Sequence, residues 1–251
     1  MIADLLRPAW PAPANVVALT TTRSGGVSSG PYASMNLGDH VGDAPEAVAA
    51  NRAALQAACD GLGAISWLQQ VHGTAVVAAD ATVAQSADAQ VTREPGIGCA
   101  IMTADCLPVL FCDRRGSQVA AAHAGWRGLC AGVLERTLAA FADPAAVIAW
   151  MGPAIGPGNF EVGEEVRAQF MAAADSAAQR DAIARAFVPA VRAAHFHADI
   201  YALARIRLRA AGALSIYGGG LCTVADSARF FSFRRDGVSG RMASLIYLKP
   251  A

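Results

Sequence analysis

The chain has 251 residues, of which 54% are hydrophobic and 16% charged, and its 20 basic and 20 acidic residues give a formal net charge of zero. This hydrophobicity excludes an intrinsically disordered chain, and the balanced charge offers no chain-wide basic surface, so we expect no nucleic-acid partner. Lys249 is the one lysine, which argues against a P-loop lysine or a Schiff-base lysine. We expect any bound anion to be held by arginine or by backbone N–H groups.

The N-terminal segment lacks the basic and apolar regions of a signal peptide, and the uncharged stretch 144–160 is interrupted by prolines and glycines. We therefore expect a cytoplasmic protein without a membrane-spanning segment. Six cysteines in a chain of this length do not form a dense disulfide framework. Because no Cys-x-x-Cys pair occurs, neither a zinc ribbon nor a thioredoxin-like redox site is predicted.

In chain order, residues 15–22 form a predicted strand that runs into the turn 23–26. Asp43 is the predicted N-cap of a helix over residues 44–59, since Pro45 lies in its first turn and Glu46 follows the cap by three residues. Short apolar runs then predict strands over 65–71, 74–79, 98–103, 107–112 and 118–123.

A second predicted helix opens at Gly125 and reaches about Phe141, where Asp143 and Pro144 end it. The remaining predictions are a strand over 147–151, helices over 163–174, 176–188 and 199–212, and strands over 214–217, 229–234 and 243–248. Strands and helices mix without strict βαβ alternation, which is typical of an α+β fold. Since no linker-like segment or repeat occurs, we expect one domain over residues 1–251.

Three segments place a metal-binding side chain at the end of an apolar strand, beside glycine or proline. They carry His72, Cys106 and His123. Side chains can converge on a pocket at such strand ends, because the backbone there can approach a ligand closely. Two imidazoles and a thiolate suit Zn²⁺, and three protein ligands leave a fourth position open, as in catalytic sites. Spacing alone is a weak signal, because buried cysteines and single histidines usually have structural roles.

The three segments read QQVHGT, TADCLPV and AAHAGWRG. In this order they resemble the signature blocks of the laccase-domain or polyphenol oxidase-like family, members of which are also described as purine nucleoside phosphorylases and peptidoglycan editing factors. Further matching blocks are residues 22–28, 36–38, 152–156 and 232–236. The resemblance implies zinc bound by His72, Cys106 and His123, with Cu²⁺ as the alternative ion. It also implies packed mixed β-sheets flanked by helices, in α/β/β/α layers.

The resemblance further implies phosphorolysis of adenosine, inosine or guanosine to the base and ribose-1-phosphate, and also deamination of adenosine. The small-molecule partners would therefore be a purine nucleoside and phosphate. Arg23, in a Ser-Gly-Gly turn whose N–H groups could form an anion nest, is the first candidate for phosphate, and Arg127 is the second. Gln70 shares a strand face with His72, so we expect it to contact substrate. Asp105 is a candidate to orient a ligand histidine, although a turn role is equally consistent with its position.

Three alternatives stay open at this stage. The chain could be a hydrolase that acts on peptidoglycan precursors, either with Cys106 as the nucleophile and His123 or His72 as the base, or through hydrolysis by the zinc site. The metal could instead stabilise a binding module without catalysis. Copper-dependent polyphenol oxidation is disfavoured, because multicopper sites need many His-x-His pairs and the chain has five histidines. The only such pair, His195 and His197, is predicted to lie in a surface loop. The sequence leaves monomer and homodimer equally open.

Overall fold

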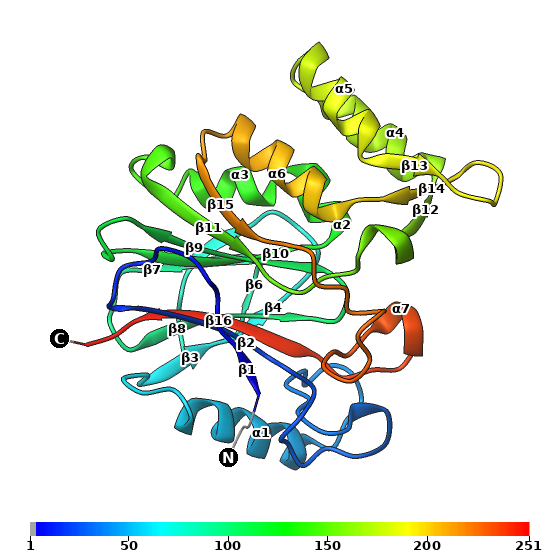
Figure 1. Ribbon diagram of the computed structural model, residues 1–251. Helices are drawn as coiled ribbons and strands as arrows, with labels where there is room; N and C mark the ends of the chain where they lie inside the picture. The colour runs from blue at the N-terminus through cyan, green and yellow to red at the C-terminus, as the bar shows by residue number, and fades with distance from the viewer. Residues whose placement is uncertain (1–3, 251) are drawn as a thin grey trace.

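The computed structural model describes residues 4–250. Two mixed β-sheets lie face to face, and helices cover both outer faces (Figure 1). The predicted α+β fold and its α/β/β/α layers are confirmed. No helix within residues 4–250 has the length and apolar character needed to cross a membrane.

The five-stranded sheet has the order β1-β2-β16-β8-β3, in which only the β3–β8 pair is parallel. Its strands are β1 (Leu5–Leu6), β2 (Val16–Thr21), β16 (Met242–Leu248), β8 (Ile97–Thr103) and β3 (Ala64–Ser66). Helix α1 (Pro45–Ala57) covers its outer face, because Val48 and Leu55 share one side of the helix and are buried. Leu55 belongs to the same apolar cluster as Leu19 and Tyr247 of the sheet.

The six-stranded sheet has the order β15-β11-β9-β10-β7-β5, with parallel pairs at its two edges. Its strands are β15 (Ser215–Gly218), β11 (Val147–Met151), β9 (Leu107–Asp113), β10 (Val119–Ala124), β7 (Ala89–Thr92) and β5 (Val76–Ala78). The outer face is covered by α2 (Trp126–Ala131), α3 (Val133–Leu138) and α6 (Ile200–Ala210) (Figure 1).

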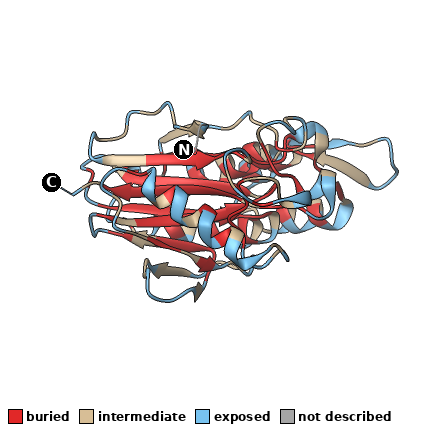
Figure 2. Ribbon diagram, turned by 90° about the horizontal axis from the view of Figure 1, so that it is seen from below, coloured by how far each residue is buried: buried red, intermediate tan, exposed pale blue. Residues whose placement is uncertain are grey.

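Side chains along β9 alternate between the two faces of its sheet, as a strand buried on both faces requires. Phe111 packs with Leu134 and Leu203 of the covering helices, whereas Leu110 packs with Ile101 and Ile246 of the opposite sheet. Buried residues accordingly fill the central strands of both sheets (Figure 2), whereas the edge strands β1, β5 and β15 contain none. The two sheets form a rigid base for the loops at their ends.

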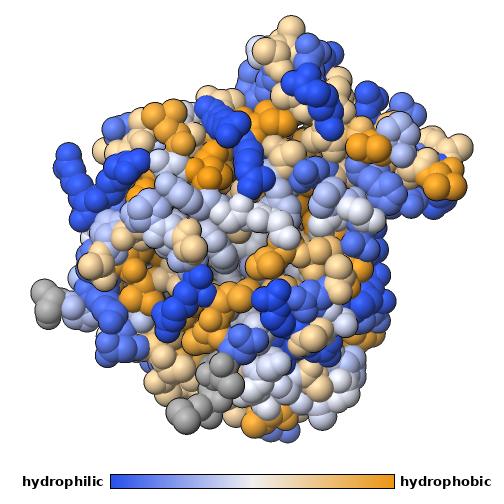
Figure 3. Space-filling view, viewed as in Figure 1, coloured by the Kyte–Doolittle hydropathy of each residue, from blue (hydrophilic) through white to orange (hydrophobic). Residues whose placement is uncertain are grey.

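A peripheral unit extends from the layers (Figure 1). It consists of the antiparallel sheet β12-β14-β13 with helices α4 and α5. Its elements are β12 (Glu161–Gly163), α4 (Glu164–Ala172), α5 (Ala177–Arg185), β13 (Phe187–Pro189) and β14 (His195–Ala198). Hydrophilic and hydrophobic residues are interspersed over this face of the molecule (Figure 3).

Several sequence-based boundaries are wrong. The helix predicted to run to Phe141 is two helices, because Gly132 adopts a left-handed conformation (φ 98°) between them. The strand predicted over 65–71 is interrupted and continues as β4 (Leu68–Gln69), which pairs with β6 (Gln85–Ser86). Asp43 does not cap α1: Ala44 is the N-cap residue, and Asp43 accepts hydrogen bonds from Ala44 N and Asn36 Nδ2.

The strand predicted over 229–234 is also wrong. Its second half begins helix α7 (Phe233–Asp236), because the Ser232 hydroxyl accepts a hydrogen bond from the backbone N–H of Arg235 and caps the helix. The segment with His195 and His197 is strand β14 instead of a loop, and both side chains are half-buried. The predicted cap of α6 is confirmed, since Asp199 accepts a hydrogen bond from Ala202 N.

Tyr201 holds the loop that follows β11. Its buried hydroxyl accepts a hydrogen bond from Ala154 N (2.8 Å) and donates to Leu221 O (2.7 Å). Ile155 N in turn donates to Asp105 O (2.9 Å), the carbonyl next to Cys106. The tyrosine therefore connects α6 to the backbone around Cys106.

Tyr201→Phe should lower the free energy of unfolding by about 1–3 kcal/mol, because it leaves the buried Ala154 N–H without an acceptor. Urea denaturation followed by circular dichroism measures the change. The matched control is Tyr217→Phe, since the half-buried Tyr217 hydroxyl makes no hydrogen bond within residues 4–250. Equal stabilities of the two variants would contradict this role of Tyr201.

Candidate metal centre

The three candidate metal ligands lie together where the two main sheets meet. They are His72, Cys106 and His123. His72 lies in the connection from β4 to β5, and Cys106 lies in the connection from β8 of one sheet to β9 of the other. His123 lies near the end of β10, in register with Pro108 of β9. The three potential ligand atoms are within 4.8 Å of one another. The structure thus brings together the three residues singled out in the sequence.

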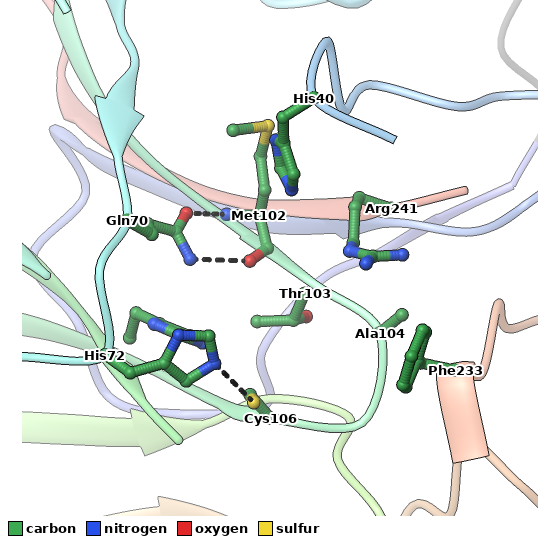
Figure 4. A pocket seen from close by; sticks show the side chains of 10 residues that line it. His40, Gln70, His72, Met102, Thr103, Ala104, Cys106, Phe233 and Arg241 are labelled. Atoms are coloured by element: carbon green, nitrogen blue, oxygen red, sulfur yellow. Dashed lines mark hydrogen bonds between the residues drawn. The ribbon is translucent and has the colours of Figure 1, made fainter. Parts of the chain in front are cut away.

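The distances within this group are short enough for a shared ion. His72 Nε2 is 3.8 Å from Cys106 Sγ (Figure 4). The imidazole rings of His72 and His123 meet edge to face, with their centroids 4.7 Å apart. A tetrahedral zinc ion with ordinary bond lengths separates its ligand atoms by about 3.5 Å. Small side-chain movements therefore suffice for all three residues to coordinate one ion.

Asp88 orients both histidines. Its buried carboxylate lies 2.8 Å from His123 Nδ1, which leaves Nε2 of that ring for an ion. The same carboxylate accepts hydrogen bonds from the backbone N–H groups of Val71, His72 and Gly73. These contacts hold His72 in a left-handed conformation (φ 59°), which is uncommon for a residue other than glycine.

Gly125 provides the space in which the three side chains meet. A Cβ atom at this position would lie 2.9 Å from His72 Cδ2, 3.1 Å from Cys106 Sγ and 3.5 Å from His123 Cε1. Any larger residue would therefore displace the ligands. The cavity and the nitrogen and sulfur donors both fit a metal ion.

The thiol and imidazole groups also perturb each other electrostatically. Burial alone raises the pKa of the Cys106 thiol, but the charge of His123 and hydrogen bonds from both histidines outweigh it and lower the pKa. Burial alone lowers the pKa of His123, but the negative charges of Cys106 and Asp88 raise it above the usual value. Both shifts favour the thiolate form of Cys106, which is the form that binds metal.

The group opens into a first pocket of about 280 Å³, which we call the Arg241 pocket (Figure 4). Its lining residues are His40, Gln70, His72, Met102, Thr103, Ala104, Cys106, His123, Phe233 and Arg241. Gln70 does lie here, but its amide pairs with the backbone of Met102 through Nε2–O and Oε1–N contacts of 2.8 Å each. Gln70 therefore holds the His72 loop against β8.

A second pocket of about 270 Å³ adjoins the first, and we call it the Trp126 pocket. Its lining residues are Ala104, Asp105, Cys106, Trp126, Arg127, Ile155, Phe160, Ile200, Phe233 and Arg234. The exposed Arg127 guanidinium stacks on the Trp126 ring at 4.5 Å. Arg127 thus lies beside the candidate centre.

Arg23 lines neither pocket. Its guanidinium donates hydrogen bonds to Ala33 O and Ser227 O and lies over the Phe231 ring at 4.9 Å. The turn around Arg23 therefore uses the guanidinium to connect the N-terminal loop with the segment before α7. The structure gives no contact between Arg23 and the metal centre.

Asp105 does not contact a ligand histidine. Its carboxylate accepts hydrogen bonds from Thr223 Oγ1 and Arg234 N, both at 2.6 Å. The histidine partner is Asp88. Like Arg241 and Phe233, it was not among the site residues predicted from the sequence. A polar residue in the buried run 87–92 was the available signal for Asp88. Phe233 was hidden by the wrong strand prediction.

Comparison with known proteins identifies the family. A sequence profile described as multi-copper polyphenol oxidoreductase laccase matches residues 17–249. The chain belongs to this family. The resemblance seen in the sequence blocks is thereby confirmed.

Relatives of the laccase-like family cover nearly the whole chain. Purine nucleoside phosphorylase PA4543 of Pseudomonas aeruginosa is 54% identical over 245 residues, which cover 97% of this chain and 98% of that protein. Purine nucleoside phosphorylase YfiH of Escherichia coli is 51% identical over 98% of this chain and 100% of that protein. The crystal structure of Neisseria meningitidis protein NMB0706 superposes with a TM-score of 0.92 at 50% identity, covering 99% and 100% of the two chains.

The laccase-like family implies a metal, and the chain has one group that could hold it. Among residues 4–250, His72, Cys106 and His123 are the one group of three such side chains with suitably close ligand atoms. The His-Cys-His group can therefore bind a metal ion.

Asp88→Asn should weaken metal affinity by about 10–100-fold, because partners that orient metal-bound histidines contribute by this amount. Competition with a chromophoric chelator measures the affinity. The control is Asp113→Asn, whose carboxylate likewise accepts backbone N–H groups but lies away from both pockets. Unchanged affinity in a folded Asp88→Asn protein would contradict the assignment.

In metal-free protein, iodoacetamide should modify Cys106 faster than Cys130 at neutral pH. The pKa of Cys106 is lowered, so its thiolate persists to lower pH, whereas burial raises the pKa of Cys130. Peptide mass spectrometry with time gives both rates. A modification of Cys106 no faster than that of Cys130, or one unaffected by added zinc, would argue against this thiolate.

Proposed function

We propose that the chain is a zinc-dependent purine nucleoside phosphorylase that converts adenosine, inosine or guanosine and phosphate into the base and ribose-1-phosphate. The observation that carries this proposal is a His-Cys-His group opening into a pocket that also contains the Arg241 guanidinium. Relatives 45–54% identical bear the name purine nucleoside phosphorylase. Zinc is the proposed ion because two imidazoles and one thiolate suit it and leave a position for substrate.

The proposed reaction transfers the ribosyl group from purine to phosphate. The C1′–N9 bond breaks and its electron pair leaves with the purine, while an oxygen of monohydrogen phosphate forms a new bond to C1′. The phosphate proton ends on the purine, so atoms and charge balance. A zinc ion held by His72, Cys106 and His123 supplies a localised positive charge and Lewis acidity.

The chain's own groups supply binding and orientation. Asp88 fixes the ring positions of His123 and the His72 loop, so that both point into the same space. The Arg241 guanidinium can offer charge and directional N–H donors to phosphate. Phe233 and Trp126 provide aromatic surface next to Cys106 for the nucleoside.

Adenosine deamination remains a second predicted reaction, and chromatography with adenosine as the substrate and without phosphate would detect it as inosine. Cell-wall precursor hydrolysis and phenol oxidation are not favoured. The relatives that are 45–54% identical to this chain are named purine nucleoside phosphorylases. The five histidines of the chain also remain too few for a multicopper site.

Purified protein with full zinc occupancy should release base and ribose-1-phosphate from inosine only when phosphate is present. Cys106→Ser should lower this rate by more than about 100-fold. Loss of a residue that only orients a metal ligand already lowers metal affinity or activity by about 10–100-fold, and Cys106 would be a ligand itself. Chromatography of the products and elemental analysis for zinc and copper measure activity and metal together. Cys130→Ser is the matched control, because this half-buried thiol lies outside both pockets. No turnover at full zinc occupancy, or full activity of Cys106→Ser, would refute the proposal.

A further inference from the structure

The two pockets meet at the metal-binding thiol. Ala104, Cys106 and Phe233 line both of them. The exposed Phe233 ring projects from α7 at the edge of the Arg241 pocket (Figure 4). The Arg241 pocket and the Trp126 pocket are therefore two compartments of one site. They meet at Cys106, and Phe233 lines both of them.

The Arg241 pocket is suited to an anion. No aspartate or glutamate is among its described lining residues, whereas Arg241 contributes a half-buried cation. Arg241 Nη1 donates to Ser239 O and Gly240 O, but within residues 4–250 the guanidinium forms no ion pair with a carboxylate. Burial lowers the pKa of Arg241, while the more distant charges of Cys106 and Asp105 raise it. A half-buried cation without a carboxylate partner is stabilised by a bound anion.

Thr103 adds a second polar group to this compartment. It is 2% exposed, and its Oγ1 has no hydrogen-bond partner among the described residues. Thr103 lines the same pocket below Arg241 (Figure 4). A buried hydroxyl without a partner is costly, so a side-chain rotation that turns this hydroxyl toward the pocket would let a bound phosphate oxygen or a water satisfy it.

The Trp126 pocket has a different character. Trp126, Phe160 and Phe233 give it three aromatic walls. Its carboxylate, Asp105, opposes the entry of an anion. Its two arginines are exposed and already engaged: Arg127 stacks on Trp126, and Arg234 donates to Glu161 O and lies 5.8 Å from the Phe160 ring centroid.

We propose that phosphate binds in the Arg241 pocket and the purine base in the Trp126 pocket, with the ribose C1′ held between them beside Cys106. This inference rests on the proposed function. It places the two reactants on either side of the carbon at which the C1′–N9 bond breaks and the C1′–O bond to phosphate forms. It also assigns phosphate to Arg241, in place of the sequence candidates Arg23 and Arg127.

Steady-state kinetics with inosine and phosphate varied separately test the assignment. Arg241→Gln should raise the KM for phosphate by at least about tenfold, because one charge-assisted contact is lost, and should leave the KM for inosine within about twofold. Arg241→Lys should restore part of the phosphate affinity. Phe160→Leu should show the opposite pattern, with a raised KM for inosine. Arg136→Gln removes an exposed arginine on α3, outside both pockets, and controls for the change in net charge.

A binding measurement separates this inference from the proposed function. Inorganic phosphate titrated into zinc-loaded protein should broaden its ³¹P resonance, and Arg241→Gln should abolish the broadening. Hypoxanthine should quench tryptophan fluorescence in wild type but not in Trp126→Phe. If wild type binds both probes but turns over no nucleoside, the proposed function fails and the pocket assignment stands. If Arg241→Gln is folded and binds phosphate like wild type, or raises only the KM for inosine, the assignment is overturned.

Discussion

The candidate centre depends on the hydrogen bonds of one buried carboxylate. Asp88 contacts His123 Nδ1 and three successive backbone N–H groups of the His72 loop. A buried carboxylate without partners is costly, so these four donors are required for its burial. The same contacts hold His72 and His123, which are far apart in the sequence, in one fixed arrangement. The left-handed backbone of His72 is held by this contact.

The position of the centre follows from the way the two sheets are connected. The loops that carry His72 and Cys106 both leave strands outside the six-stranded sheet and then enter that sheet. Packing of Ile101 and Ile246 against Leu110 fixes the distance between the sheets. The apolar core thus sets the separation of the ligands, and the polar contacts set their orientation.

The sequence predicted the parts of this structure that depend on local pattern. The α+β class follows from the mixed order of predicted strands and helices, and the resemblance of three short blocks to one family pointed to His72, Cys106 and His123. Its place in an apolar run could have marked Asp88 as a buried polar residue, but its partner could not be assigned, because His123 is 35 residues away along the chain. Arg241 likewise reaches the site only through the pairing of β16 with β8. A strand was predicted over 229–234, but the cap at Ser232 favours a helix from Phe233 onward.

The location of the ligands where the two sheets meet also determines which state of the chain contains the complete metal site. His72 and Cys106 belong to crossings between sheets, and His123 belongs to the six-stranded sheet itself. The full set of three ligands forms only after the two sheets have associated. A metal that binds this set stabilises the associated state over every partly folded state by mass action. The complete three-ligand site therefore exists only in the state in which the sheets are associated, so tight metal binding by all three residues depends on correct packing of the sheets.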